Sequence, residues 1–352
     1  MNAPFAPVLD RIRLADLSEP DEMARLERFV ERQGGSVFHR PAWLAAIERG
    51  TGQYACGLVA EKGGVLAGWL PLSEVHSPIF GRALVSSGFA VGGGVLANDN
   101  ATADRMCRAA EELALRLSCA TVELRGGHAP GDWRVRRDSH CGFVADLAGD
   151  DDAQLLAIPR KQRAEVRKGL DAELTVEVGA GGSDRAAHYA VYTESVRNLG
   201  TPVFPKGMFD AVIDALDADI LTVRHRGRPV ASVLSLYHDN TVLPYWGGGT
   251  QAARPLRAND RMYFELMLHA RRRGCTRFDF GRSKTGSGAY HFKRNWGFEP
   301  EPLAYASWTA PGAKPRDADP TSARHSARIA LWKRLPLALA NRLGPPIARG
   351  LG

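Results

Sequence analysis

A lysine near the end of the chain has neighbours that suit a catalytic role. Lys293 lies beside Phe292 and near Trp296, so apolar packing could hold its side chain in one position. An ammonium group held in this way can neutralise the oxyanion of a tetrahedral intermediate or a phosphate of a donor. The alternative is a surface lysine whose stem covers aromatic rings while its charge stays in water.

A carboxylate precedes this lysine in a short apolar strand. Asp279 lies between Phe278 and Phe280, so strand alternation directs its carboxylate to the opposite face from the two rings. A carboxylate in the middle of a strand needs a partner. It is either a general base for an acceptor amine or the ion-pair partner of Arg282 or Lys284.

Two aromatic residues and three glycines form a second group. Tyr245 and Trp246 either stack on a donor or acceptor base or fill the core. We predict Tyr245 as a catalytic candidate, and Trp246, Gly247 and Gly248 as donor- or substrate-binding residues. Gly247, Gly248 and Gly249 would let backbone N–H groups approach an acyl carbonyl. No Ser, Cys or His falls in a recognisable nucleophile elbow, so direct attack by an acceptor amine is the simpler mechanism.

The segment 281–288 follows the strand of Asp279. It is rich in glycine, hydroxyl and basic residues, including Arg282 and Lys284. Loops at strand ends often line sites, and we therefore predict contact with a ligand. The alternative is a plain connection, because the segment lacks the G-x-x-x-x-G-K-[ST] order of a phosphate-binding loop.

A basic helix is expected over residues 160–168. At 100° per residue, Arg160, Arg163 and Arg167 share one stripe. Glu165 is the only acid among them, so the helix either binds an anion or presents a solvated face. Clustered phosphates of a tRNA, a nucleotide diphosphate or a lipid diphosphate would suit it. We predict donor or substrate contact for its five cations: Arg160, Lys161, Arg163, Arg167 and Lys168.

Composition narrows the class of protein. The 352 residues are 44% hydrophobic and 24% charged, as in globular proteins, and the net charge of +7 favours an anionic partner. No apolar run is long enough to span a bilayer, and the start lacks signal-peptide features. Five separated cysteines form no C-x-x-C pair. We expect a cytoplasmic protein with reduced cysteines and no metal site.

The first half of the sequence recurs in order in the second. The pattern of each half predicts a helix, a hairpin, a strand, a helix and a strand, which indicates an α/β (α+β) unit duplicated in tandem. In the second half, Asn259 lies where we expect the N-cap of the helix that follows the three glycines. The matching segments are 37–47 with 203–213, 63–72 with 227–236, 92–94 with 247–249, 97–99 with 258–260, and 119–124 with 275–280.

This unit is similar to the GNAT acyltransferase fold, in which two central strands part to admit an acyl donor. Two such units in one chain resemble the FemAB/FemX peptidyltransferases, which add amino acids from aminoacyl-tRNA to a cell-wall precursor. Residues 159–168 resemble that family's basic junction helix, and residues 291–298, with His291-Phe292-Lys293-Arg294, resemble its Phe-Lys motif. The resemblance implies that Lys293 is at the acyl-transfer site, and we add Arg294 to the binding residues.

Three further segments are similar to one branch, the FemAB-related proteins associated with exosortase and PEP-CTERM systems. They are residues 198–204, 244–249 and 278–284. This likeness implies an acceptor linked to exopolysaccharide or the cell envelope. The chain lacks the coiled-coil arm of some FemA proteins and, at residues 254–259, the glycines of a GNAT pyrophosphate loop. The donor therefore stays open between aminoacyl-tRNA and acyl-CoA, and no bound cofactor is expected.

The expected organisation has four parts: a first GNAT-like domain (1–150), the junction helix (151–173), a catalytic second domain (174–310), and a linker with a C-terminal amphipathic helix (311–352). That helix either packs on the first domain or lies on an anionic membrane surface at the inner face. We predict an N-acyl or aminoacyl transferase for an anionic acceptor. The alternatives are a CoA-dependent N-acyltransferase and a non-catalytic basic protein that binds nucleic acid or a membrane surface.

Overall fold

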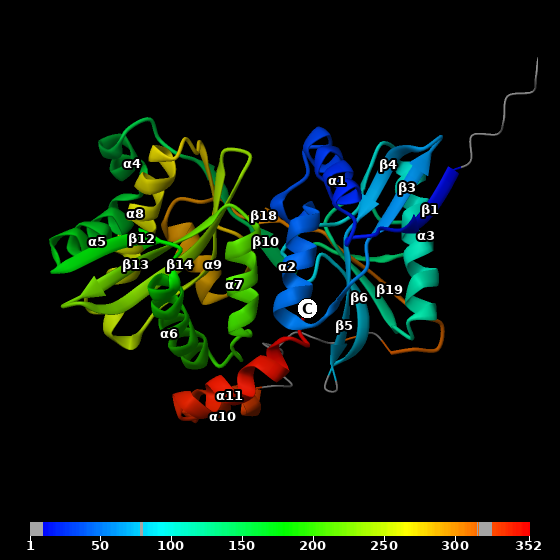
Figure 1. The fold of residues 1–352 in the computed structure, drawn as a ribbon. Coiled ribbons are helices and arrows are strands. Elements are labelled where there is room, and N and C mark those ends of the chain that lie inside the picture. The colour runs from blue at the N-terminus through cyan, green and yellow to red at the C-terminus, as the bar shows by residue number, and fades with distance from the viewer. Residues whose placement is uncertain (1–9, 78–79, 315, 317–325) are drawn as a thin grey trace, which may run out of the picture. The chain divides into compact units, whose positions relative to one another are not determined.

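The computed structural model describes residues 10–77, 80–314, 316 and 326–352, which fold into two compact units (Figure 1). The first unit takes residues 1–136, 304–318 and 350–352, and the second takes residues 137–303 and 319–349. The linker expected at residues 311–322 lies largely outside the described residues.

The first unit has two sheets, and the chain passes from one to the other where β5 follows β4. Their orders are β1-β3-β4-β7 and β2-β5-β6-β8-β19-β9, and Pro71 separates β4 from β5. Its elements are β1 (Asp10–Leu14), α1 (Pro20–Arg32), η1 (Val37–His39), α2 (Pro41–Thr51), β2 (Tyr54–Ala55), β3 (Leu58–Lys62), β4 (Val65–Leu70), β5 (Leu72–Ser77), β6 (Gly81–Ser86), β7 (Leu96–Ala97), α3 (Asn100–Arg116), β8 (Thr121–Arg125), β9 (Arg134–Arg136) and β19 (Tyr305–Thr309).

The second unit has one six-stranded sheet of order β11-β16-β15-β14-β13-β12 and a small sheet of order β17-β10-β18. Its elements are β10 (His140–Gly142), β11 (Val144–Asp146), α4 (Asp151–Ala157), α5 (Arg160–Asp171), β12 (Leu174–Gly179), α6 (Gly182–Leu199), α7 (Lys206–Ala215), β13 (Ala218–His225), β14 (Arg228–His238), β15 (Thr241–Gly249), η2 (Gln251–Ala253), α8 (Ala258–Arg272), β16 (Arg277–Asp279), β17 (Ser283–Lys284), α9 (Gly288–Asn295), β18 (Glu301–Pro302), α10 (Ser326–Arg334) and α11 (Leu337–Ala348).

The two units repeat one topology, which confirms the predicted fold class. In the first, β3 and β4 form a hairpin and β6 runs parallel to β8. In the second, β13 and β14 form the matching hairpin and β15 runs parallel to β16. In each sheet, the next strand beside the parallel pair is antiparallel to its neighbour. This strand is β19 beside β8 in the first unit and β11 beside β16 in the second.

The closing strands explain why the units divide the chain differently from the expected boundaries. Residues 137–150, expected in the first domain, belong to the second unit because β11 pairs with β16. Residues 304–310, expected in the second domain, belong to the first unit because β19 pairs with β8 and β9. Each unit thus receives one strand from beyond its own repeat.

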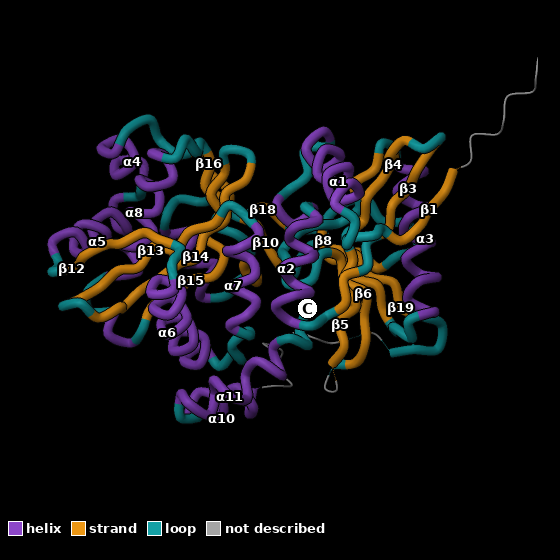
Figure 2. The backbone as a smooth tube through the Cα atoms, in the orientation of Figure 1, coloured by secondary structure: helices purple, strands orange, loops and turns teal. Residues whose placement is uncertain are grey.

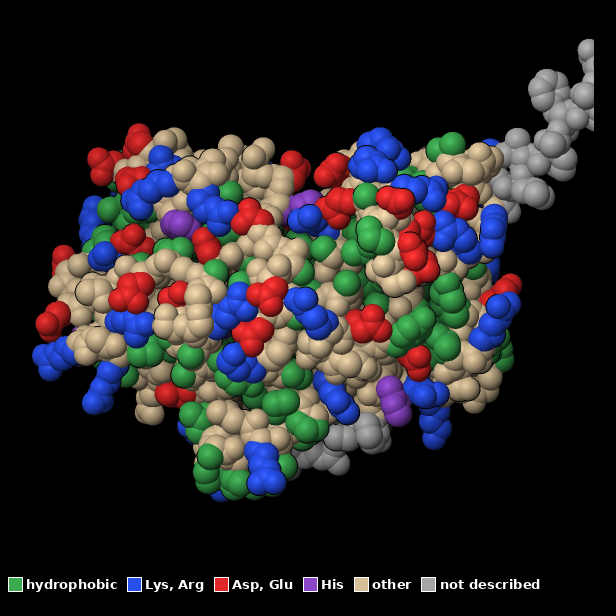
Figure 3. Space-filling model, viewed as in Figure 1, with side chains coloured by type: hydrophobic (Ala, Val, Ile, Leu, Met, Phe, Trp, Pro, Cys, Tyr) green, Lys and Arg blue, Asp and Glu red, His purple; other side chains and the backbone are tan. Residues whose placement is uncertain are grey.

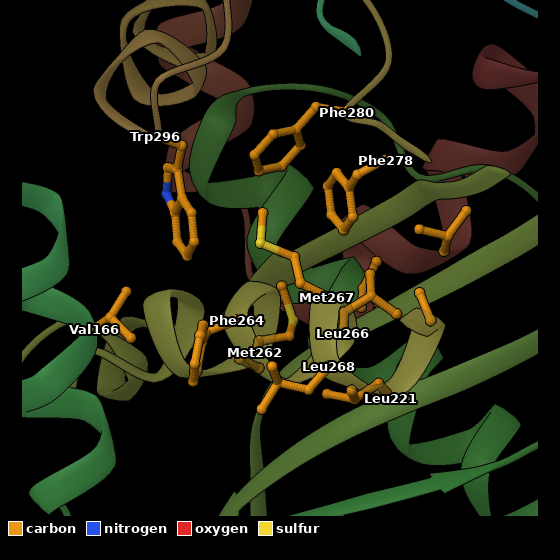
Figure 4. Close-up of a cluster of buried hydrophobic side chains, with 14 of the residues drawn as sticks. Val166, Leu221, Met262, Phe264, Leu266, Met267, Leu268, Phe278, Phe280 and Trp296 are labelled. Carbon is orange, nitrogen blue, oxygen red and sulfur yellow. The ribbon is translucent and has the colours of Figure 1, made fainter. Parts of the chain in front are cut away.

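Helices cover both faces of the main sheet in the second unit (Figure 2). Along β14 the side chains alternate: Ser232 bonds to His188 of α6, whereas Val233 belongs to the core that includes Met262 of α8. Period-two alternation therefore places α6 and α8 on opposite faces. Figure 4 shows part of the α8 core, where Met267 lies among the aromatic rings.

The C-terminal helices pack on α6 and belong to the second unit, whereas the sequence left packing on the first domain or contact with a membrane surface open for them. Ile329 of α10 lies against Gly200, the left-handed C-cap of α6, where a Cβ would meet its side chain. Arg197 of α6 donates to the carbonyl of Lys333 at 3.3 Å. Within the described ranges, no helix combines the length and the apolarity needed to cross a membrane.

Candidate active site

The two central strands of the second unit part early. β15 pairs with β16 only through Thr241 with Arg277 and Val242 with Phe278. β16 ends at Asp279, whereas β15 continues to Gly249 in register with β14. From residue 243 onward, β15 therefore has no strand partner on the β16 side of the described sheet. This leaves one backbone edge of β15 available to a ligand.

A β-bulge lies where the strands part. Leu234 is opposite Trp246 and Ser235 is opposite Pro244, so Tyr245 is the extra residue. Tyr245 and Trp246 were predicted either to stack on a base or to fill the core. Trp246 fills the core: it is 5% exposed and its ring lies 4.9 Å from that of Phe209. Tyr245 remains half-buried and packs edge-on against Trp246.

The glycines after the bulge stay in the β14 ladder, so the bulge is at Tyr245 and not among them. Their small size serves close approach. A Cβ on Gly248 would overlap the Ser195 hydroxyl of α6, and one on Gly249 would overlap the side chain of Asn259. Gly249 therefore brings the end of β15 against the first turn of α8.

The first turn of α8 has two arginines and a helix N-terminus that suit an anion. Asn259 is its second residue, not the N-cap that we expected, and its buried Oδ1, a hydrogen-bond acceptor, has no donor among the described residues. The N-cap is Arg257, in the left-handed conformation with φ of 52°. Exposed Arg254 precedes it. The partial positive charge of a helix N-terminus adds to these two cations.

The basic helix α5 packs on this same turn. Gln162 donates to Asp260 at 2.6 Å, Glu165 pairs with Arg257, and Gly169 leaves room for the Arg257 carbonyl. Burial raises the pKa of the Asp260 carboxyl. These contacts fix α5 beside the start of α8, although the two helices are about a hundred residues apart in the sequence.

The cations of α5 divide into two groups. Arg163 donates to the carbonyls of Ile158 and Leu156 at the end of α4, and Lys168 pairs with Glu165. Of the three arginines predicted to share a stripe, Arg163 therefore directs its guanidinium to the end of α4. Three cations remain exposed without an ion-pair partner in the described chain: Arg160, Lys161 and Arg167.

Lys293 of α9 is buried, with 9% of its surface exposed, so it is not a snorkelling surface lysine. Its Nζ donates to the carbonyls of Gly281 and Arg282, at 3.0 and 2.9 Å. It also lies 5.4 and 5.6 Å from the ring centroids of Phe143 and Phe280. Burial lowers the pKa of Lys293 to about 8, against the opposing charge of Asp279. An ammonium has three N–H groups, so one remains for a substrate oxygen.

Asp279 is coupled to Lys293 across the end of β16. Its carboxylate accepts a 2.9 Å hydrogen bond from the backbone N–H of Gly281. Burial raises its pKa, while that hydrogen bond and the charge of Lys293 lower it. Lys293 and Asp279 therefore hold the turn at Gly281 from both sides, the lysine through carbonyls and the aspartate through an N–H.

The segment after this turn is more ordered than its composition predicted. Ser283 and Lys284 form β17, which pairs with Cys141 and His140 of β10. Arg282, just before them, is half-buried, and Arg294 on α9 is exposed. The structure thus gathers Lys293, Asp279 and Arg282 at the end of β16.

Several residues of the site were missed from the sequence. Arg257, Gln162 and Ser195 have ordinary neighbours in the sequence and gave no signal. Gly169 could have been noticed, because a glycine inside a helix usually has a packing reason. Its Cβ would lie 2.9 Å from the Arg257 carbonyl.

Comparisons with known proteins agree with this geometry. Residues 159–294 match the sequence profile of the acetyltransferase (GNAT) domain. Among solved structures, FemX superposes with a TM-score of 0.62 at 15% identity, covering 81% of this chain and 95% of FemX. A tandem GNAT protein from the clavulanic acid pathway gives 0.56 at 10% identity, covering 87% and 100%.

A third similar structure is the C-terminal domain of a protein named as a lysylphosphatidylglycerol synthetase from Agrobacterium fabrum. It gives a TM-score of 0.56 at 15% identity, covering 83% of this chain and 92% of that one. No curated protein sequence matches the chain. Residues 159–294 thus form a domain of the acetyltransferase (GNAT) type, which contains the parted strands and the bulge, and the chain has the fold of tandem GNAT proteins.

Proposed function

We propose that the second unit transfers an acyl or aminoacyl group from a phosphate-bearing donor to an amine on an anionic acceptor linked to the cell envelope or to exopolysaccharide. The observation that carries this proposal is the edge of β15 that extends beyond β16 in the described sheet and ends at the basic first turn of α8. An acyl chain could lie along this edge, and the phosphates of the donor would then meet the cations of that turn.

The proposed reaction is a direct displacement. The acceptor amine attacks the donor carbonyl, a C–N bond forms, and the C–S or C–O bond to the donor breaks. The proton that the amine loses passes to the leaving thiolate or alkoxide, with Asp279 as the relay. Lys293 directs its third N–H toward the developing oxyanion. A covalent enzyme intermediate is not favoured, because both cysteines of this unit are buried and burial raises the pKa of Cys275.

A CoA-dependent N-acyltransferase is the second candidate, favoured by the acetyltransferase domain match. Residues 254–259 lack the glycines of a GNAT pyrophosphate loop, and Arg257 has a left-handed conformation that glycine would adopt without strain. This difference from the GNAT loop favours a donor other than CoA. In the FemX-like alternative, the three exposed cations of α5 contact the phosphates of a charged tRNA.

Thermal stabilisation of the whole protein by each donor separates these candidates. The probes are acetyl-CoA, a mixture of aminoacyl-tRNAs, and uncharged tRNA as the matched control. Stabilisation by aminoacyl-tRNA above that given by uncharged tRNA supports the aminoacyl donor and contradicts the CoA candidate. Stabilisation by acetyl-CoA alone has the opposite meaning. Binding of any nucleic acid, with no transfer to amine acceptors, would contradict the proposal as a whole.

A further inference from the structure

The C-terminal segment is strongly basic. Between Ser326 and Gly352 the sequence contains no aspartate or glutamate and five arginines and lysines. The rest of the chain contains acidic and basic residues in mixture, so a segment of this length with basic residues alone differs from the rest of the sequence. Such a segment repels basic surfaces and attracts anionic ones.

The helix α11 presents its larger apolar residues outward. The side that packs on the second unit carries small residues, Ala340, Gly344 and Ala348, all buried. A Cβ on Gly344 would lie 2.9 Å from the backbone N of Val203, so this close approach requires glycine. Small residues thus hold the helix in place, while Leu339 and Leu343 lie outside this packing.

The outward side of α11 combines leucine and arginine. Leu339 and Leu343 are 48% and 49% exposed, and Arg342 and Pro346 are exposed between and beyond them. Their spacing of i, i+3, i+4 and i+7 places all four on one side of the helix. An amphipathic helix of a soluble protein usually turns its leucines to the core, so this helix has the reverse arrangement.

The helix α10 repeats this pattern. Ile329 faces inward against Gly200, while Leu331 is 66% exposed and Arg334 is exposed beside it. Figure 3 shows hydrophobic side chains gathered with basic ones over these two helices. Single exposed leucines are ordinary. Here three of them alternate with cations on two consecutive helices.

We propose that the outward residues of α10 and α11 bind the surface of a bilayer that contains anionic lipid. We name them the α10–α11 face: Leu331, Arg334, Leu339, Arg342 and Leu343. The leucines would enter the boundary between head groups and acyl chains, and the arginines would remain with lipid phosphates. The absence of acids from the segment favours an anionic surface over a protein partner of mixed charge. This inference goes beyond acyl transfer and does not depend on it.

Co-sedimentation of the whole protein with vesicles tests the proposal. The protein is expected to bind vesicles of phosphatidylglycerol and phosphatidylcholine, to bind pure phosphatidylcholine vesicles much more weakly, and to dissociate as salt is raised. The double variant Arg334→Gln with Arg342→Gln should lower binding about thirtyfold. Each cation near an anionic surface contributes about 1 kcal/mol, and about 1.4 kcal/mol corresponds to a tenfold change in affinity.

A second variant tests the apolar part. Leu339→Ser with Leu343→Ser should lower binding about tenfold or more, because half-exposed leucines lose the area that they would bury. The matched control is Leu156→Ser with Arg226→Gln, since both residues are exposed in the second unit but lie outside the face. This control should bind as the unmodified protein does, and circular dichroism should show all variants to be folded.

Three results would overturn the proposal. They are equal binding to neutral and anionic vesicles, unchanged binding in both face variants, and a shift of the free protein from a larger to a smaller species in the variants. The third would assign the face to a second copy of the chain. Transfer between a soluble donor and acceptor should be unaffected by these substitutions, so failure of the acyltransferase proposal is measured separately.

Discussion

The two units share a strand order but differ where their parallel central strands end. In the second unit, β15 runs on alone past β16. In the first, the chain leaves β6, loops out, and returns at Val95, which forms a parallel bridge with Gly127 beyond the end of β8. Gly94 lies so close that a Cβ there would overlap the Gly126 carbonyl. The same place is thus bridged in the first unit, whereas in the described sheet of the second unit no strand pairs there.

A buried cation accompanies each of these endings. In the first unit, Arg125 at the end of β8 donates to the Ala90 carbonyl at 2.7 Å and to the Gly352 carbonyl at 2.7 Å. In the second, Lys293 donates to the carbonyls of Gly281 and Arg282, which leaves the third N–H of its ammonium group for a substrate. The two units thus share one topology, and in the described residues β15 of the second unit extends beyond its parallel partner. The division into a supporting and a transferring half is the prediction that follows.

Replacing the two buried cations gives the largest expected contrast. Lys293→Ala should lower kcat about a hundredfold, as expected when one oxyanion donor is removed. Arg125→Gln should leave kcat within about twofold but destabilise the protein by about 1–3 kcal/mol, because buried carbonyls lose their donor. Transfer assays and thermal denaturation measure the two effects. Equal loss of activity in both variants would contradict the division between the units.

The pH dependence of transfer sharpens the same contrast. Lys293 must be charged to stabilise an oxyanion, so the rate should fall about tenfold per pH unit above its pKa of about 8. Asp279 must be ionised to relay a proton, so the rate should also fall at acid pH, below a pKa that burial raises. A pH–rate profile measures both limbs. An alkaline limb that survives in Lys293→Ala would belong to another group.

Surface charge offers a matched pair of variants. Arg160→Gln with Arg167→Gln should raise KM for the donor several-fold to about tenfold, with kcat little changed, because charge-assisted contacts to phosphate are lost. Arg134→Gln with Arg136→Gln removes the same charge from exposed positions in the first unit. Steady-state kinetics at two salt concentrations should show no KM change for the second pair. Equal changes in both pairs would indicate only the overall field of the protein.

The smallest expected effect concerns the matched helices α3 and α8. Asp99 caps α3 by accepting from the Thr102 N–H at 2.7 Å, so Asp99→Ala should cost about 1 kcal/mol of stability without changing KM. Its counterpart Asp260 instead accepts from Gln162 of α5. Asp260→Ala should therefore loosen α5 and raise KM for the donor. Denaturant unfolding and kinetics together check the pair, and a cap-like result at Asp260 would contradict this assignment.

Some features of the fold and site could be predicted from the sequence because they depend on local pattern. The hairpins of the two halves follow from the apolar runs on either side of the turns at Gly63 and Gly227, and the core role of Trp246 was one of two open interpretations. The cluster of Lys293 and Asp279 was predicted as two candidates, without their shared contact at Gly281.

Other features depend on contacts between distant residues and left no local pattern. β10, β17 and β18 are two or three residues long, too short for a period to show, and they exist because they pair with one another. The Tyr245 bulge is a mismatch between two strands and is not a property of either. Arg163 was assigned to an anion because the sequence does not reveal that α4 ends beside it.

The closing strand of the first unit has a consequence for synthesis of the chain. Tyr305–Thr309 must pair with β8 and β9, and the Gly352 carbonyl accepts a hydrogen bond from Arg125. Residues 305–309 and Gly352 nevertheless leave the ribosome after the whole six-stranded sheet of the second unit. The copy that is translated first is therefore completed last. A nascent chain stopped before residue 305 should contain a finished second sheet and an unfinished first one, the reverse of the usual order in which tandem domains mature.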